Sequence, residues 1–69
     1  MKISARNTLK GKIVEVTKGA TTAHVRFDIG NGVVMTSSIT NATVNELGLV
    51  VDGEAYAVIK ASDVMVAVN

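Results

Sequence analysis

The chain has 69 residues, enough for one domain, and a domain this short buries only about 60% of its unfolded surface, so its core is marginal without a supplement. The absence of cysteine excludes disulfides, and a single histidine without a thiolate excludes a structural zinc site. A net charge of +1 provides no long-range field that would attract nucleic acid or an anionic membrane, so any anion site must be local.

Self-association remains as the additional source of stability for this marginal core. Apolar residues make up 48% of the chain, and a small monomer has too much surface for its size to bury so many apolar side chains. The sequence therefore predicts a homo-oligomer with an extensive apolar interface. It contains no apolar run of about eighteen residues, and its start, MKISARN, lacks the apolar centre of a signal peptide, so we predict a cytoplasmic protein.

The first half of the chain alternates with a period of two, which is typical of strands. The predicted strands are Met1 to Asn7, Lys12 to Lys18, Thr21 to Ile29 and Val33 to Ile39. In the third of these, Ala23, Val25 and Phe27 share one face and predict a half-buried strand. Gly30-Asn31-Gly32 predicts the hairpin that follows, because these residues tolerate positive φ.

The second half begins with the only predicted helical turn, from Thr40 or Asn41 to a left-handed cap at Gly48. Strands from Glu54 to Lys60 and from Val64 to Val68 follow, separated by a bend at residues 61–63. We therefore predict an all-β protein, a small OB-like Greek-key barrel of about five strands with one short helix, formed as a single domain by residues 1–69.

Three places in this pattern carry groups that suit an oxyanion. Ser4 and Arg6 lie two residues apart on the predicted first strand, so their side chains leave the same face. Lys60 supplies a second positive charge at the end of a late strand. Thr40 and Thr43 flank the start of the helical turn, where backbone N–H groups lack partners. Neither cation accepts a hydrogen bond, so together they favour an anion over a neutral ligand.

Motifs along the whole chain also resemble a known family. The segments SARN-x-LKG at Ser4–Gly11, ELG at Glu46–Gly48 and VIK-x-SDVM at Val58–Met65 resemble the molbindin (Mop) family, whose small members bind molybdate and tungstate. The resemblance implies an OB-like fold and a non-enzymatic role in intracellular storage, buffering or homeostasis of these anions. It also implies a hexamer, a trimer of dimers with N-terminal strands exchanged between subunits.

The resemblance further assigns residues to the oxyanion site. It implies Ser4 and Arg6 from one subunit and Thr40, Thr43, Lys60 and Ala61 from its neighbour. Ala61 stands where relatives carry serine, so a hydroxyl contact would move to Ser62 or be lost, while a backbone N–H at Ala61 would remain. The resemblance also implies a second class of site on a threefold axis. The sequence leaves two candidates for the residue that would bind the ligand there, Asn7 and Lys10.

Structural roles compete with each of these assignments. Arg6 and Lys60 are equally suited to be solvated charges on strand edges, Thr40 to cap a helix, and Ser62 to form a turn. A capping box between Thr43 and Glu46 would also need no ligand.

Other functional classes find weaker support. The alternative function, a single-stranded nucleic-acid-binding OB module, would need aromatic platforms and a basic groove, but the chain has one phenylalanine and one tyrosine. His24 has no partner at metal-ligand spacing, and no nucleophile with a base is evident, so we predict no catalytic residues, no catalytic cofactor and no metal bound except as its oxyanion.

Overall fold

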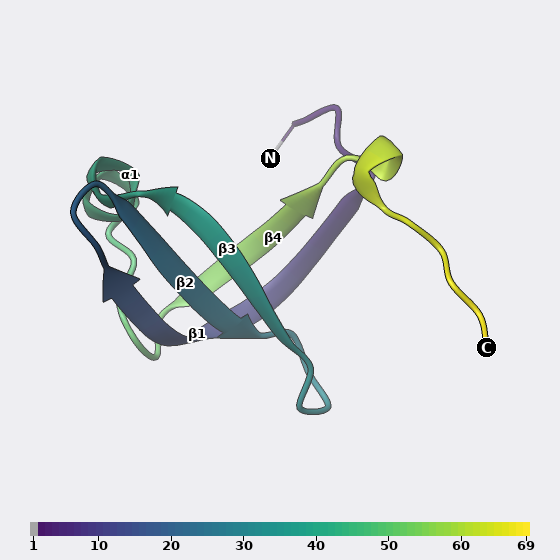
Figure 1. Cartoon of the computed structure of the whole chain (residues 1–69), viewed down its shortest axis with the longest axis horizontal. Helices are drawn as coiled ribbons and strands as arrows, with labels where there is room; N and C mark the ends of the chain where they lie inside the picture. The colour runs from purple at the N-terminus through teal and green to yellow at the C-terminus, as the bar shows by residue number, and fades with distance from the viewer. Residues whose placement is uncertain (1) are drawn as a thin grey trace.

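A computed structural model describes residues 2–69 of the chain, so Met1, the first residue of the predicted first strand, lies outside the described residues. The strands are β1 (Asn7–Lys18), β2 (Thr22–Asp28), β3 (Val34–Thr40) and β4 (Glu54–Ile59), with helix α1 (Asn41–Leu47) before β4 and a 3₁₀ turn, η1 (Ala61–Asp63), after it. The molecule is mostly β with one short α-helix, as the sequence predicts (Figure 1).

The strands form one antiparallel sheet in the order β3-β2-β1-β4. β1 is long enough to pair with two strands. Its first half, Asn7–Lys12, pairs with β4, and its second half, from Lys12 onward, pairs with β2. A β-bulge between Ile13 and Glu15 separates the two halves and bends the strand. The sheet curls strongly as a result, into an open half-barrel (Figure 1).

The concave side of the sheet carries the core. The alternation in β2 is as predicted, with Ala23, Val25 and Phe27 buried and the residues between them exposed. Ile13 from β1, Ala57 from β4 and Val44 from α1 complete the buried cluster. Gly11 belongs to this packing, because a Cβ there would lie 2.8 Å from the Asp28 carbonyl oxygen.

Helix α1 starts and ends at the residues that the sequence indicates. Thr40 is the N-cap, and its side chain accepts a hydrogen bond from the Thr43 backbone N–H at 3.1 Å. Gly48 ends the helix in the left-handed conformation at φ 64°. The alternative capping box between Thr43 and Glu46 is wrong, because Thr43 lies inside the helix, in its first turn.

The two ends of the chain differ from the prediction. Residues 2–6 are bent rather than extended as a strand, and the strand begins at Asn7, where pairing with Ile59 of β4 begins. The predicted strand from Val64 to Val68 is also wrong for this single chain, because no neighbouring strand pairs with it among residues 2–69. The described chain therefore has four strands rather than about five.

No helix in the described part of the chain combines the length and apolarity needed to cross a membrane.

Candidate functional site

The two predicted ligand cations lie at the same end of the sheet. Asn7 of β1 pairs with Ile59 of β4, and the Asn7 side-chain amide donates to the Ile59 carbonyl at 3.3 Å. Continuing this antiparallel register by one residue places Arg6 opposite Lys60. Two residues more than fifty positions apart in sequence are thus brought to one strand end by the β1–β4 ladder.

The η1 turn follows Lys60 directly. It is closed by the Asp63 N–H donating to the Lys60 carbonyl at 2.9 Å and the Val64 N–H donating to the Ala61 carbonyl at 3.2 Å. Lys60 makes no side-chain cap bond to this turn, and Ala61 and Ser62 are exposed. Lys60, Ser62 and the first backbone N–H groups of η1 therefore follow the strand end at which Asn7, the residue after Arg6, pairs with Ile59.

Neither cation is neutralised within residues 2–69. The ion pairs in this part of the chain are Lys10–Glu54 at 3.4 Å, Lys12–Asp52 at 3.6 Å and Arg26–Glu15 at 3.3 Å. Arg6 and Lys60 take part in none of them, although both are exposed. Two like charges facing each other without a counter-charge repel, and an anion between them removes that repulsion. This end of the sheet is consequently a local anion-attracting region on a nearly neutral protein.

Ser4 precedes this region in the bent N-terminal segment and is exposed. The predicted reason for its convergence with Arg6, a shared strand face, does not hold, because neither residue lies in a strand. The proximity of the two residues now follows only from their spacing along the chain.

The two threonines form a separate group at the start of α1. The Thr40 and Thr43 hydroxyl oxygens lie 2.8 Å apart, and the Thr40 oxygen also accepts the Thr43 N–H. Thr40 is exposed and Thr43 half-buried. The pair caps the helix and still leaves hydroxyl capacity for a ligand, because each hydroxyl has two acceptor positions and a rotatable donor.

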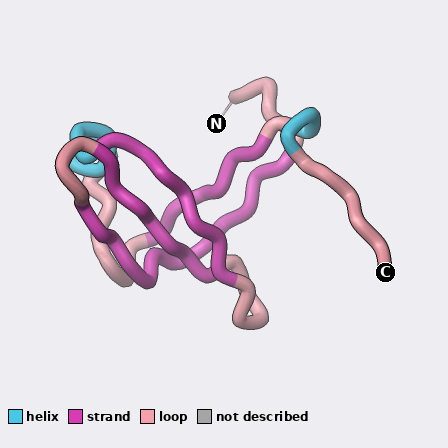
Figure 2. The backbone as a smooth tube through the Cα atoms, viewed as in Figure 1, coloured by secondary structure: helices cyan, strands magenta, loops and turns pink. Residues whose placement is uncertain are grey.

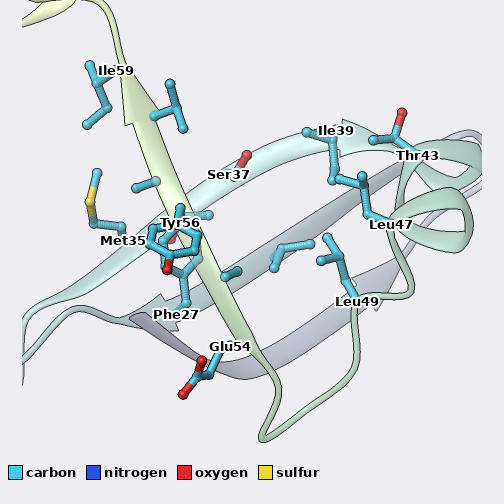
Figure 3. Close-up of a pocket in the computed structure, with 15 residues that line it drawn as sticks. Phe27, Met35, Ser37, Ile39, Thr43, Leu47, Leu49, Glu54, Tyr56 and Ile59 are labelled. Carbon is cyan, nitrogen blue, oxygen red and sulfur yellow. The ribbon is translucent and has the colours of Figure 1, made fainter. Parts of the chain in front are cut away.

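A single chain does not bring the cations and the threonines together. Figure 1 shows η1 and α1 at opposite ends of the molecule along its longest axis. Figure 3 shows the same separation, with Ile59 at one end of a groove and Thr43 at the other. The structure therefore gathers Arg6, Lys60, Ala61 and Ser62 in one group and Thr40 with Thr43 in another, so that Lys60 lies with Arg6 rather than with the threonines.

Asn7 and Lys10, the two candidates for a threefold-axis site, already make side-chain contacts within the chain. The Asn7 amide binds the Ile59 carbonyl, and Lys10 pairs with Glu54 on an exposed surface. His24 is exposed in β2, and no cluster of three potential metal ligands occurs among the described residues.

The groove in Figure 3 was not predicted from the sequence. It has a volume of about 630 Å³ and lies between β3 and β4. Its lining is mainly apolar and includes Phe27, Met35, Ile39, Leu49 and Tyr56. A signal was present in β4, where the five residues after Glu54 are all apolar although one edge of this strand is unpaired among residues 2–69.

Comparison with known proteins agrees with this architecture. The family model described as the TOBE domain matches residues 3–66. A relative from Haemophilus influenzae, named a probable molybdenum-pterin-binding protein, is 56% identical over 69 residues, which is 100% of both chains. The chain belongs to the TOBE domain family, in its molbindin group.

Solved molbindin-group structures share the fold over almost the whole chain. MopII from Clostridium pasteurianum has a TM-score of 0.89 and 46% identity, covering 97% of this chain and 100% of that one. A molybdate-binding protein from Sporomusa ovata has a TM-score of 0.91 and 34% identity, covering 97% and 98%. The resemblance inferred from the three sequence motifs is confirmed, and the half-barrel of this molbindin is the fold of the group.

Proposed function

We propose that this molbindin binds molybdate, and tungstate comparably, in an intracellular storage or buffering role. The observation that carries the proposal is the convergence of Arg6 and Lys60, without counter-charges in the described chain, at one end of the β1–β4 ladder. The relatives add support, because the Sporomusa ovata protein of the same fold is described as molybdate-binding. No bond is made or broken in this function, which fits a chain whose relatives are named as binding proteins.

The proposed site is shared between subunits. Ser4, Arg6, Lys60, Ala61 and Ser62 would come from one chain, and Thr40 and Thr43 from another. The separation of η1 and α1 within one chain supports this division, because one copy cannot place both groups around a single small anion (Figure 1). In this arrangement Lys60 and Ala61 come from the same chain as Ser4 and Arg6. The family resemblance instead implies that they come from the chain that supplies the two threonines.

Each group has a distinct task in this site. The Arg6 guanidinium can donate two parallel hydrogen bonds to neighbouring oxygens, while the Lys60 ammonium acts as a point charge. The hydroxyls and backbone N–H groups supply neutral donors for the remaining oxygens. Two charge-assisted contacts with several neutral ones are consistent with dissociation constants on the order of micromolar or lower. Selection against sulfate follows from size, since a smaller tetrahedron cannot reach donors fixed on two subunits.

We further propose a cytoplasmic hexamer, built as a trimer of dimers with exchange of terminal segments. The 48% apolar content and a described surface that exposes Leu47, Val50, Val51 and Val58 support self-association. The nucleic-acid alternative lacks comparable support. Phe27 is buried and leaves Tyr56 as the only exposed aromatic side chain in the described chain, so no stacking platform is present there.

The central test replaces Arg6 with alanine. We expect Arg6→Ala to bind molybdate about 2 to 4 kcal/mol more weakly in calorimetry, because a charged hydrogen-bonding partner is lost. Arg26→Ala is the matched control, since it removes the same charge from an exposed side chain paired with Glu15 and should leave affinity unchanged. An unchanged affinity in Arg6→Ala, with the oligomer intact, would refute the assignment.

Sharing between chains can be tested by mixing two inactive variants. Arg6→Ala and Thr43→Val each damage one half of the proposed site. Co-assembly after unfolding and refolding together would create some sites with an intact Arg6 group from one chain and an intact Thr43 from the other. We expect partial recovery of high-affinity binding in the mixture. A site contained within one chain would show no recovery.

A further inference from the structure

We propose that Asn31, at the tip of the β2–β3 hairpin, is a site of spontaneous deamidation that leaves the fold and the anion site intact. Asn31-Gly32 is the only Asn-Gly pair in the sequence. Asparagine is among the residues that limit the chemical lifetime of proteins. The proposal goes beyond anion binding and does not depend on the identity of the ligand.

The reaction takes place within the chain and needs only water. The Gly32 backbone nitrogen loses its proton and forms a bond to Asn31 Cγ, while the bond from Cγ to Nδ2 breaks and ammonia leaves. The product is a cyclic succinimide. Water then opens the ring at one of its two carbonyl carbons. Opening at Cγ leaves an aspartyl residue at position 31, and opening at the main-chain carbonyl leaves an isoaspartyl residue.

The attacking nitrogen is accessible and is not engaged in the fold. Asn31 and Gly32 are exposed, and Figure 2 shows their loop projecting beyond the ends of β2 and β3. The loop is closed at its base, where the Ile29 N–H donates to the Val33 carbonyl at 2.9 Å and the Val33 N–H donates to the Gly30 carbonyl at 3.0 Å. The Gly32 N–H donates no hydrogen bond within residues 2–69.

The conformation of the turn slows the attack without preventing it. Asn31 and Gly32 have φ of 52° and 74°, as the central residues of a type I′ turn require. This turn directs the Gly32 nitrogen away from the Asn31 side chain, so the peptide group between them must rotate first. A Cβ built on Gly30 or Gly32 would meet no atom of the described chain within 4 Å. The rotation is therefore unobstructed, and exposed loop tips open at little cost in free energy.

The turn at Asp52-Gly53 shows the opposite situation. An aspartyl-glycyl pair can form the same ring, and Asp52 also has a positive φ, 72°. Here the Gly53 N–H donates to the Val50 carbonyl at 3.0 Å. Ile13 holds both sides of the pair, since its carbonyl accepts the Asp52 N–H and its N–H donates to the Gly53 carbonyl, each at 2.8 Å. Rotation would break these bonds, so Asp52 is protected.

Three other asparagines are held in regular structure. Asn7 lies in β1, and Asn41 and Asn45 lie in α1. The Asn7 and Asn41 side-chain amides donate to the carbonyls of Ile59 and Gly19. The Asn45 side-chain oxygen accepts from the Lys18 ammonium at 2.7 Å. None of the three precedes a glycine. The structure therefore concentrates the reaction at position 31.

Deamidation changes the charge of the molecule but not its architecture. The new carboxylate lowers the net charge from +1 to zero. Seven residue pairs between β2 and β3 fix the register on either side of the loop, so the extra main-chain atom of an isoaspartyl residue is confined to the tip. The tip lies apart from both α1 and η1 (Figure 1). An ageing population of this protein thus divides into charge forms that share one fold.

Peptide mapping of the wild-type protein during incubation in warm neutral buffer tests the site. We expect Asn31 to convert at most about tenfold more slowly than in a free peptide of residues 28–34, because the loop tip opens readily. Both aspartyl and isoaspartyl products should appear. Conversion slower than this limit, or faster conversion at another asparagine or at Asp52, would overturn the proposal. An aspartyl product alone would also overturn it, because the ring opens in both directions.

Asn31→Gly removes the reactive amide and suits the positive φ of the turn. We expect this variant to lose the acidic form that the wild type accumulates in ion-exchange chromatography. Asn45→Gln is the matched control, since it removes an exposed asparagine amide from α1, and it should accumulate the acidic form at the wild-type rate. Unchanged accumulation in Asn31→Gly would overturn the assignment.

The isolated acidic form of the wild type tests the consequence. Its assembly mass, its melting temperature and its molybdate titration should match those of the fresh protein. A loss of assembly, or weaker molybdate binding in the acidic form alone, would overturn the inference that the modification is silent. Absence of molybdate binding in both forms would refute only the ligand proposed above and would leave the mapping of Asn31 as the deciding result.

Discussion

Replacing Lys60 with glutamine separates a ligand from a solvated surface charge. Lys60 is exposed, makes no cap bond to η1 and takes part in no ion pair within residues 2–69. Without anion, Lys60→Gln should therefore change the free energy of unfolding by no more than about 0.5 kcal/mol. Relief of repulsion with Arg6 would act in the stabilising direction.

The effect of the same change on the anion-bound protein should be much larger. An anion at 100 times its dissociation constant stabilises the folded protein by about 2.7 kcal/mol. Loss of one charge-assisted hydrogen bond worth about 2 kcal/mol weakens binding about 30-fold, and the stabilisation at the same concentration falls to about 0.9 kcal/mol. For a domain of this size, the rise in melting temperature should shrink from roughly 11–22 °C to about 4–7 °C.

Thermal unfolding with and without molybdate, at one protein concentration, measures this difference. Lys12→Gln is the control, because it removes the same charge from an exposed lysine that pairs with Asp52 away from η1. The control should keep the full wild-type shift. An equal shift in wild type and Lys60→Gln would show that Lys60 is not a ligand and would leave it as a solvated strand-end charge.

Three further changes test the fold that supports the site. Thr40→Ala should cost about 1 kcal/mol in chemical denaturation, because the Thr43 N–H loses its cap, and no loss would contradict that role. Gly11→Ala should cost about 1 to 3 kcal/mol by the same assay, because its Cβ would lie 2.8 Å from the Asp28 oxygen, and a neutral result would mean that the sheet relaxes freely. Ile13→Ala should cost about 2 to 5 kcal/mol, because Ile13 is only 1% exposed, and a loss below 1 kcal/mol would place it outside the core.

The local features of the fold were predictable because their causes are local. Alternation in β2 predicts its buried face, and Gly30-Asn31-Gly32 predicts its hairpin, in which all three residues have positive φ. Thr40 and Gly48 predict both ends of α1. Each of these features depends on residues within a few positions of one another.

The remaining features depend on contacts between distant segments. Arg6 and Lys60 meet only because β1 pairs with β4, a register that no short stretch of sequence encodes. The pattern of Val64–Val68 is typical of a strand, but a strand forms only where an edge is available to pair with it. Thr40 and Thr43 were named from their place at the start of the helical turn and from the family resemblance, but the separation of this turn from Ile59, the residue before Lys60, could be seen only in the structure (Figure 3).

The bulge in β1 limits how the length of this strand can change. Before the bulge, Ile13 faces the core, and after it Val16 is the next residue on β1 packed against that core, three positions later instead of two. Deleting Val14 would leave Ile13 and Val16 on one face by simple alternation, but it would remove the bulge and with it the bend between the half of β1 that pairs with β4 and the half that pairs with β2. Insertions in the hairpin at Gly30–Gly32 do not alter this bend. Natural variation in length should therefore accumulate in that hairpin, while the number of residues between Ile13 and Val16 stays constant.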